Sequence, residues 1–335
     1  MSEGFLLKGN ERLLVVRLGA MGDILHALPA VESLKRRYPA TAIDWIAKPR
    51  WMPLLEGNPS LRRAIPFDRE SGSVFATARR LRDSGYGLAI DMQGLLQSAI
   101  VTRFCGAART AGYASSACRE PLAAWFYRQR VTPASTHIAE KHLDLVRALG
   151  VNEVSLDCWL PQGEPEGQLP DVPFVLASPF AGWQSKQWPL SHYANLARLL
   201  LEDAGLTLVM NVAEADLPRL REMAPALPHV SSLAGLIDAT RRATAVVGVD
   251  SGPLHLAAAL GKPGVALFGP TDPARNGPVS KAIAVLRDAT AATSYKRDDV
   301  ESECMRRLTP EAVFAALQRA LQPTAALRQE KERIP

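Results

Sequence analysis

The sequence predicts an α/β protein of two doubly wound domains, each a parallel sheet with helices on both faces. Three observations predict this fold class. Short apolar runs of strand length alternate with longer amphipathic segments along most of the chain. Residues 161–173 are rich in Pro, Gly and Glu, lack apolar periodicity and divide that alternation into two series. The length of 335 residues is also about twice that of an ordinary domain of roughly 150 residues.

The first series opens with a continuous apolar run at 13–16, as expected of a strand buried on both faces. A glycine-containing turn follows at 19–23, and apolar residues at helical spacing predict a helix over 24–37 that Pro39 ends. Further strands are predicted at 42–47 and 88–91, and further helices at 74–84, 95–104 and 138–149.

The second series follows the linker at 161–173 with the same alternation. Its predicted strands are 174–177, 206–211, 245–249 and 265–268, and its predicted helices are 190–204, 215–224, 253–260 and 310–321. We therefore expect domains at 1–165 and 166–310, with a C-terminal helix and tail at 311–335 that frays over 324–335.

Charge is distributed unevenly between the halves. Residues 1–165 hold 21 Lys and Arg against 16 Asp and Glu, whereas residues 166–335 hold 18 of each kind. The excess predicts an anionic partner for the first half: nucleic acid, a membrane surface or a phosphorylated substrate. No set of aromatic residues is interleaved with the basic ones, which disfavours nucleic acid.

Hydropathy and cysteine spacing indicate where in the cell the protein is expected. No apolar run approaches the ~18 residues of a spanning helix, and the N-terminus has no signal-peptide core. The four cysteines show neither a CxxC pair nor zinc spacing, so we expect reduced thiols in a cytoplasmic protein.

The first motif is Gly19-x-x-Gly22-Asp23, between the first strand and its helix. It matches neither the dinucleotide pattern GxGxxG nor a P-loop. Asp23 either complements the helix dipole or acts chemically, and both interpretations stay open on spacing alone. His26 lies one turn further along the same helix face, where a packing or capping role is the simpler interpretation.

Two motifs in the second half point to an anion. The loop 178–189 follows a strand and carries Lys186, which can present a cation to a phosphate, although an ordinary βα loop would read the same. In Val249-Asp-Ser-Gly-Pro-Leu-His255, a strand runs directly into a helix, and the free amides of Ser251 and Gly252 form an anion site. Asp250 either caps that helix or binds sugar hydroxyls.

Together these segments resemble glycosyltransferase family 9, the ADP-heptose:lipopolysaccharide heptosyltransferases, over nearly the whole chain. The first half carries the resemblance in RLGAMGDILHALPA (17–30), DWIAKPR (44–50), LLEGNPS (54–60), AIDMQGLLQSA (89–99) and REPLAAWFY (119–127). The second half carries it in KQWP (186–189), VGVDSGPLHLAAALGKPGVALFGPTDP (247–273) and CMRRLTPEAV (304–313). The first-half segments look most like the members that add the first heptose to Kdo on lipid A.

The resemblance implies a GT-B fold, with two Rossmann-like domains facing a central cleft, and inverting transfer without a metal or other cofactor. It makes Asp23 the general base. It assigns the donor, ADP-heptose, to Lys186, Glu214, Asp250, Ser251, Gly252, His255 and Thr271. It leaves the acceptor, Kdo-lipid A, to the first domain, where Gly22, Lys48, Arg62, Arg63 and Arg119 are candidates, although basic runs are often only solvated faces. It implies no nucleic-acid partner, a monomer, and a peripheral location at the inner face of the inner membrane.

The sequence departs from the family pattern in the nucleotide half. The glycines usual before the ribose-binding Glu are replaced by Met210-Asn-Val-Ala213, and the segment 233–247 is shorter than usual. Two alternatives therefore stay open: a family member that uses another nucleotide sugar, and a nucleotide-sugar-binding protein without activity. A dehydrogenase is disfavoured because GxGxxG is missing.

Overall fold

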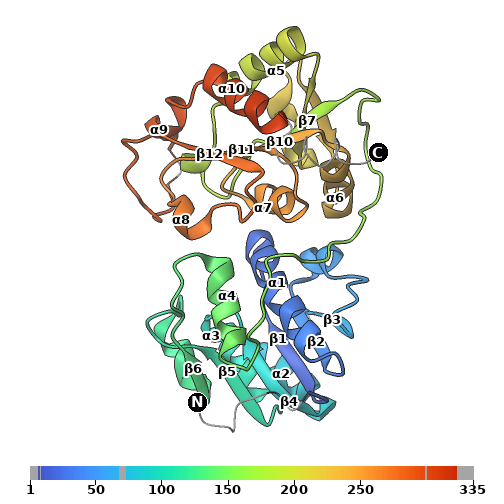
Figure 1. The fold of residues 1–335 in the computed structure, drawn as a ribbon, viewed down its shortest axis with the longest axis vertical. Helices are drawn as coiled ribbons and strands as arrows, with labels where there is room; N and C mark the ends of the chain where they lie inside the picture. Colours follow the sequence, from blue (N-terminus) through green and yellow to red (C-terminus); the bar gives the residue numbers. More distant parts are fainter. Residues whose placement is uncertain (1–6, 8, 68–72, 299, 323–335) are drawn as a thin grey trace, which may run out of the picture. The chain divides into compact units, whose positions relative to one another are not determined.

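The computed structural model describes residues 7, 9–67, 73–298 and 300–322. The chain forms two compact units, unit 1 (Met1–Pro161) and unit 2 (Gln162–Pro335), and Figure 1 labels their elements. The sequence analysis placed the boundary four residues later, after residue 165. The predicted frayed tail at 324–335 lies outside the described residues.

Unit 1 contains a parallel six-stranded sheet with the order β3-β2-β1-β4-β5-β6. Its strands are β1 (Arg12–Val16), β2 (Ala42–Ala47), β3 (Arg63–Pro66), β4 (Tyr86–Asp91), β5 (Arg109–Tyr113) and β6 (Gln129–Val131). The two central strands, β1 and β4, are nearly continuous apolar runs because helices cover the sheet on both sides.

The helices of unit 1 divide between the two faces of this sheet. They are α1 (Met21–Arg37), η2 (Pro49–Leu54), α2 (Val74–Leu81), η3 (Arg82–Ser84), α3 (Leu96–Phe104), η4 (Pro121–Phe126) and α4 (Ile138–Arg147). Helix α1 packs against α4 (Figure 1), whereas α3 packs against both α2 and η4. The right-handed crossovers of a doubly wound sheet produce this division.

Alternation along β1 shows how the sheet is buried. Leu14 and Val16 join a cluster that contains Leu81 of α2 and Val101 of α3, so these β1 side chains point toward the α2 and α3 face. On the other side, the predicted apolar stripe of α1 is fully buried. The predicted helix at 24–37 is therefore confirmed, with one more turn at its start.

Unit 2 repeats the architecture with the order β12-β11-β10-β7-β8-β9, again all parallel. Its strands are β7 (Phe174–Ser178), β8 (Thr207–Val212), β9 (Leu227–Val230), β10 (Ala245–Val249), β11 (Gly264–Phe268) and β12 (Ile283–Arg287). Its helices are η5 (Gln184–Lys186), α5 (Leu190–Ala204), η6 (Glu214–Leu220), α6 (Leu233–Arg242), α7 (Gly252–Ala259), α8 (Pro273–Asn276), α9 (Glu303–Arg306) and α10 (Pro310–Leu321).

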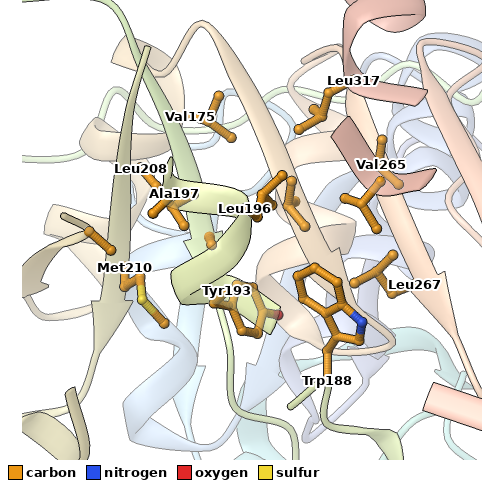
Figure 2. Close-up of a cluster of buried hydrophobic side chains, with 14 of the residues drawn as sticks. Val175, Trp188, Tyr193, Leu196, Ala197, Leu208, Met210, Val265, Leu267 and Leu317 are labelled. Atoms are coloured by element: carbon orange, nitrogen blue, oxygen red, sulfur yellow. The ribbon is translucent and has the colours of Figure 1, made fainter. Parts of the chain in front are cut away.

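The core of unit 2 fixes the loop that carries Lys186. Trp188, two residues further on, is buried with its indole edge against the ring of Tyr193 at a centroid distance of 4.8 Å (Figure 2). Its Nε1 donates to the Leu308 carbonyl at 2.7 Å. This anchoring holds the β7–α5 loop from its C-terminal end, since a buried indole with a satisfied N–H resists displacement.

Two predictions are corrected by the structure. The helix predicted at 215–224 is wrong: a 3₁₀ helix covers Glu214–Leu220, because Pro218 has no N–H to donate and cannot extend an α-helix. The linker at 161–173 has no helix or strand, but it is not free of unit 2. The Glu166 carboxylate accepts hydrogen bonds from the N–H and hydroxyl of Ser232, both at 2.6 Å.

Candidate active site

Both sheets have a topological switch point, where neighbouring strands are followed by connections that run in opposite directions. It lies between β1 and β4 in unit 1 and between β7 and β10 in unit 2. Doubly wound proteins bind ligands at the carboxyl ends of the strands beside such a point. The residues predicted to be catalytic or to bind phosphate, Asp23, Lys186 and Asp250, follow these strands.

In unit 1 the carboxylate of Asp23 folds back onto the start of helix α1. Its Oδ2 accepts a hydrogen bond from the Ala20 N–H at 3.0 Å, and its Oδ1 lies 2.7 Å from Nη2 of Arg17. Arg17 is buried, and its Nη1 donates to the Met92 carbonyl at 2.5 Å. The side chain of Asp23 is 38% exposed, so the carboxylate is oriented by two donors and still reachable from solvent.

Glycine at position 19 is required by the shape of this turn. Gly19 has φ of +145°, a conformation that residues with a side chain rarely adopt, and a Cβ there would lie 2.5 Å from Nε1 of Trp51. That Nε1 is buried and has no hydrogen-bond partner among the described residues. Gly22, half-buried on α1, immediately precedes Asp23.

The loop after β4 supports the same region. The buried Asp91 accepts hydrogen bonds from the N–H of Gln93 at 2.7 Å and from the Tyr127 hydroxyl at 2.6 Å. Burial raises the pKa of Asp91, although these hydrogen bonds oppose the rise. Gln93 in turn accepts from the Leu18 N–H at 2.7 Å, which ties the β4 loop to the end of β1.

The predicted acceptor-binding residues divide into two groups. Lys48 follows β2 and its N–H donates to the Leu18 carbonyl, while the exposed Arg119 lies beside the loop after β4. Both are therefore at the carboxyl edge of the sheet, as is Asp23. Arg62 and Arg63 instead begin β3 at the amino edge, so the structure does not bring them to Asp23.

Arg62 and Arg63 both form ion pairs with the buried carboxylate of Asp44. Nη2 of Arg62 lies 2.5 Å and Nε of Arg63 lies 2.9 Å from Oδ2 of Asp44, which also accepts from the Tyr86 hydroxyl at 2.6 Å. Burial alone would raise the pKa of Asp44, but the two guanidinium groups and Tyr86 outweigh it and hold that pKa below its ordinary value. An unpaired carboxylate at this depth would be costly, which gives both arginines a structural role.

In unit 2 the predicted donor residues converge on Asp250, at the end of β10. Nζ of Lys186 lies 2.6 Å from Oδ2 of Asp250, and the Thr271 hydroxyl donates to the same oxygen at 2.8 Å. Nε2 of His255 lies 3.6 Å from the other oxygen, Oδ1. Burial raises the pKa of Asp250, but His255 and Lys186 outweigh it and hold the pKa well below its ordinary value. The ammonium of Lys186 also lies 4.2 Å above the ring of Trp183.

The helix that starts beside this cluster has no acidic residue in its first turn. Ser251 is the N-cap of α7, but its side chain makes no capping bond, and its buried Oγ has no partner among the described residues. Pro253 stands in the first turn, where its missing N–H costs nothing. The amides that follow Asp250, including that of Gly252, remain suited to an anion.

Among the residues predicted to bind the sugar donor, Glu214 lies apart from the cluster around Asp250. It lies at the start of η6, just beyond the carboxyl end of β8, and is exposed. No described residue forms an ion pair with it. It shares the carboxyl edge of the sheet with Lys186 and Asp250, because β8 neighbours β7 in parallel.

Sequence reasoning missed Arg17, which pairs with Asp23, and Asp91, which orders the loop after β4. A signal for Arg17 was present, since a basic residue directly follows the wholly apolar strand Leu13–Val16. Asp91 gave a weaker signal, because an acidic residue at a strand end is also a common helix or turn cap.

The described residues contain neither a metal-ligand cluster nor a membrane-spanning helix. No group of three or more His, Cys, Asp or Glu among them is placed to hold a metal ion. None of the helices described is both long and apolar enough to cross a bilayer.

Comparison with known proteins gives consistent matches. The model of glycosyltransferase family 9 (heptosyltransferase) matches residues 74–305. Lipopolysaccharide heptosyltransferase 1 of Pseudomonas aeruginosa is 30% identical over 95% of this chain and 100% of that protein. The structure of Escherichia coli heptosyltransferase WaaC with ADP-2-deoxy-2-fluoro heptose aligns with a TM-score of 0.72 at 25% identity, over 92% of this chain and 99% of that one. Escherichia coli ADP-heptose lps heptosyltransferase II aligns with a TM-score of 0.75 at 25% identity, over 95% and 99%.

Proposed function

The chain belongs to glycosyltransferase family 9, and we propose that it transfers a heptose from ADP-heptose to the Kdo region of the lipopolysaccharide inner core. In this reaction an acceptor hydroxyl attacks the anomeric carbon of the heptose. The bond from that carbon to the diphosphate oxygen breaks, the configuration inverts, and ADP leaves with the bonding electron pair. The enzyme must therefore remove one proton and stabilise one leaving anion.

Unit 2 supplies the groups that stabilise the anion. Lys186 carries a positive charge at the switch point, and the amides at Ser251 and Gly252 carry the partial positive charge of a helix start. A diphosphate that accepts hydrogen bonds from both the lysine and the amides is stabilised most in the transition state, because negative charge develops on its leaving oxygen there. Because these groups provide the positive charge, the proposed reaction needs no catalytic metal. Glu214 is assigned to the nucleotide ribose from the same edge of the sheet.

Asp250 positions the phosphate-binding lysine in this proposal. Its carboxylate holds Lys186 Nζ at 2.6 Å and is itself fixed by Thr271 and His255. An ammonium held by a buried carboxylate keeps its place before the donor arrives, which lowers the ordering cost of binding. Lys186 has further N–H donors for the diphosphate, since an ammonium has three.

Unit 1 supplies the base. Asp23 is half-exposed, and Arg17 and the Ala20 N–H orient its carboxylate, so one face of the oxygens is open to an acceptor hydroxyl. A positioned carboxylate that takes a proton as attack proceeds is worth about 10²–10⁴ in rate. Lys48 and Arg119, at the same edge of the sheet, are assigned to the acidic groups of Kdo-lipid A.

The acceptor is a glycolipid, so the proposed site of action is the inner face of the inner membrane, with the protein bound peripherally. The basic excess of residues 1–165 supports this, because lipid A phosphates and Kdo carboxylates are anionic. One copy of the chain supplies every group named here, so the proposal is for a monomer.

The observation that carries the proposal is the cluster of Lys186, Asp250, Thr271 and His255 beside the start of α7. Its test is calorimetry with ADP, UDP and GDP, followed by transfer from ADP-heptose to Kdo-lipid A. We expect ADP to bind most tightly and heptose to be transferred. Preference for UDP or GDP would favour another nucleotide sugar, and ADP-heptose binding without transfer to any core acceptor would favour a binding protein without activity.

A further inference from the structure

One face of unit 1 carries all the large apolar side chains that this unit exposes in its described residues. They are Phe75 of α2, Phe104 of α3, and Leu122 and Trp125 of η4. We call this surface, formed by α2, α3 and η4, the α3 face. Helices α1 and α4 on the opposite side of the sheet expose none among their described residues. Apolar exposure gathered on one face marks an interaction surface, whereas scattered exposure does not.

The geometry of η4 presents two of these side chains together. In a 3₁₀ helix, residues three apart lie on the same side, and Leu122 and Trp125 have that spacing. They are 56% and 75% exposed. Ala123 and Ala124 between them are buried against Ala99 of α3, so the turn has an inner and an outer side. The fold fixes the outer side and directs it to solvent.

Basic residues surround these apolar side chains. The exposed arginines on the same elements and their flanks are Arg79, Arg80, Arg103, Arg119 and Arg128. The guanidinium carbon of Arg103 lies 5.6 Å from the centre of the Phe104 ring, which in turn lies 5.7 Å from the Phe75 ring. The neighbouring Glu120, whose carboxylate accepts the Leu96 N–H at 2.6 Å, offsets only one of these five positive charges, so a basic excess remains.

We propose that the α3 face docks the protein onto an anionic phospholipid bilayer, with Leu122 and Trp125 entering the interfacial region. Tryptophan favours the boundary between headgroups and acyl chains, and arginine buries its stem while its charge contacts phosphate. Each basic residue near such a surface adds attraction to anionic lipid. The basic excess of this face and its mixture with apolar side chains favour a bilayer over a second copy of the chain, which would place arginines opposite arginines.

This inference names the surface for the membrane location in the proposed function, and rests on that function for its purpose. Docking by the α3 face keeps Asp23, Lys48 and Arg119 close to the bilayer, because η4 begins beside the loop that follows β4. A glycolipid acceptor then reaches the base while its acyl chains remain in the membrane.

The test is flotation of the full chain with vesicles of phosphatidylethanolamine and phosphatidylglycerol, compared with vesicles of phosphatidylcholine alone. We expect binding to the anionic vesicles that weakens with salt. Leu122→Ser with Trp125→Ser should reduce partition at least about tenfold. Arg79→Gln and Arg103→Gln should each reduce it by about fivefold. The matched control is Leu201→Ser, at an exposed leucine of α5 in unit 2, which should change nothing.

Two results would overturn the docking surface. One is equal vesicle binding by the wild type and the Leu122/Trp125 variant. The other is a wild-type protein that ignores vesicles but self-associates in ultracentrifugation until Leu122 and Trp125 are replaced, which would assign the face to a second copy. Calorimetry with ADP on the same preparations separates the proposals, because ADP binding depends on unit 2. If the Leu122/Trp125 variant binds ADP and also partitions onto vesicles like the wild type, the α3 face is not the docking surface, and the proposed function is unaffected.

Discussion

Unit 1 and unit 2 share one strand order, yet the helices that start beside their switch points begin differently. In α1 the protein's own carboxylate, Asp23, accepts the Ala20 N–H, so the helix start is already occupied by negative charge. In α7 the first turn has no acid, and Asp250 precedes the helix and holds Lys186. One architecture thus produces a reachable carboxylate in unit 1 and, in unit 2, a helix start without an acid beside the ion pair of Lys186 and Asp250.

The position of one acidic residue therefore distinguishes the two helix starts. At the third helical position, the carboxylate accepts the Ala20 N–H and places negative charge at the helix start, which disfavours an anionic ligand there. Before the helix, it recruits a lysine and leaves the amides available. We expect the proposed division of labour between acceptor and donor to follow from this difference.

The largest effect should come from Asp23→Asn. An amide cannot take the acceptor proton, so turnover should fall by roughly 10³-fold, while the isosteric side chain preserves the start of α1. Steady-state kinetics with ADP-heptose and Kdo-lipid A measures this. Asp83→Asn, at an exposed position of η3, is the control and should keep full activity. Wild-type turnover in the Asp23 variant would remove this residue as the base.

The next effect is on stability and compares the two βα loops directly. Gly19→Ala should destabilise the protein by about 2–4 kcal/mol, because it combines an unfavourable φ with a collision against Trp51. Gly182→Ala in the β7–α5 loop should change stability by less than about 0.5 kcal/mol, since a Cβ there meets nothing within 4 Å. Urea denaturation of the two variants checks both. Equal stability would show that the turn before Asp23 adapts freely.

Lys186→Gln should weaken ADP binding by about 10- to 100-fold, the loss expected for a charged hydrogen-bond donor to phosphate. It also leaves the buried Asp250 without its ammonium, so unfolding free energy should fall by about 1–3 kcal/mol. Adding Asp250→Asn should recover stability but not ADP affinity. Calorimetry and denaturation separate the two roles, and Lys281→Gln, an exposed lysine of unit 2, is the control. An unchanged Kd for ADP would place the phosphates elsewhere.

The smallest effect is a pH dependence expected of unit 1. His142 is fully buried, and burial, followed by the charge of Arg17, lowers its pKa well below 6.5. Below pH 6.5 the unfolded chain therefore binds a proton that the folded chain refuses, and stability should fall by up to about 1.4 kcal/mol for each pH unit.

His142→Asn should remove that part of the slope, because asparagine cannot titrate while its oxygen can replace Nδ1 beside the Tyr113 hydroxyl. Unit 2 gives the contrast. The lowered pKa of Asp250 means that its contribution, present above the ordinary value of 3.8, is lost only as pH falls through the folded pKa. Denaturation of the wild type and the His142→Asn variant between pH 7.5 and 5 measures how the free energy of unfolding changes with pH. The same pH dependence in the two proteins would contradict the assignment to His142.

The sequence predicted strands β1, β2, β4, β7, β8, β10 and β11, and missed the inner strand β5 and the edge strands β3, β6, β9 and β12. Strand β1 and helix α5 were predicted closely, because a buried strand is an unbroken apolar run and a long helix shows its stripe. Strands β3 and β9 were missed, since each is four residues long and contains a proline. Such segments become strands through pairing with a neighbour, and local composition does not encode that pairing.

The candidate site shows the same limit. Lys186 and Asp250 were each identified from local motifs, but their contact joins residues 64 positions apart and needs the sheet order to be known. Arg62 and Arg63 show the converse: their charge suggested an anionic ligand, whereas the fold gives them Asp44.

The division of labour between the units is tested most directly by titrating ADP, in one calorimetric series, into the wild type, Asp23→Asn and Lys186→Gln. We expect Asp23→Asn to bind ADP within about twofold of the wild type, whereas Lys186→Gln should lose ADP affinity by at least about tenfold. A loss of ADP affinity in the Asp23 variant as large as that in the Lys186 variant would contradict this division, because donor binding would then depend on the carboxylate assigned to the acceptor.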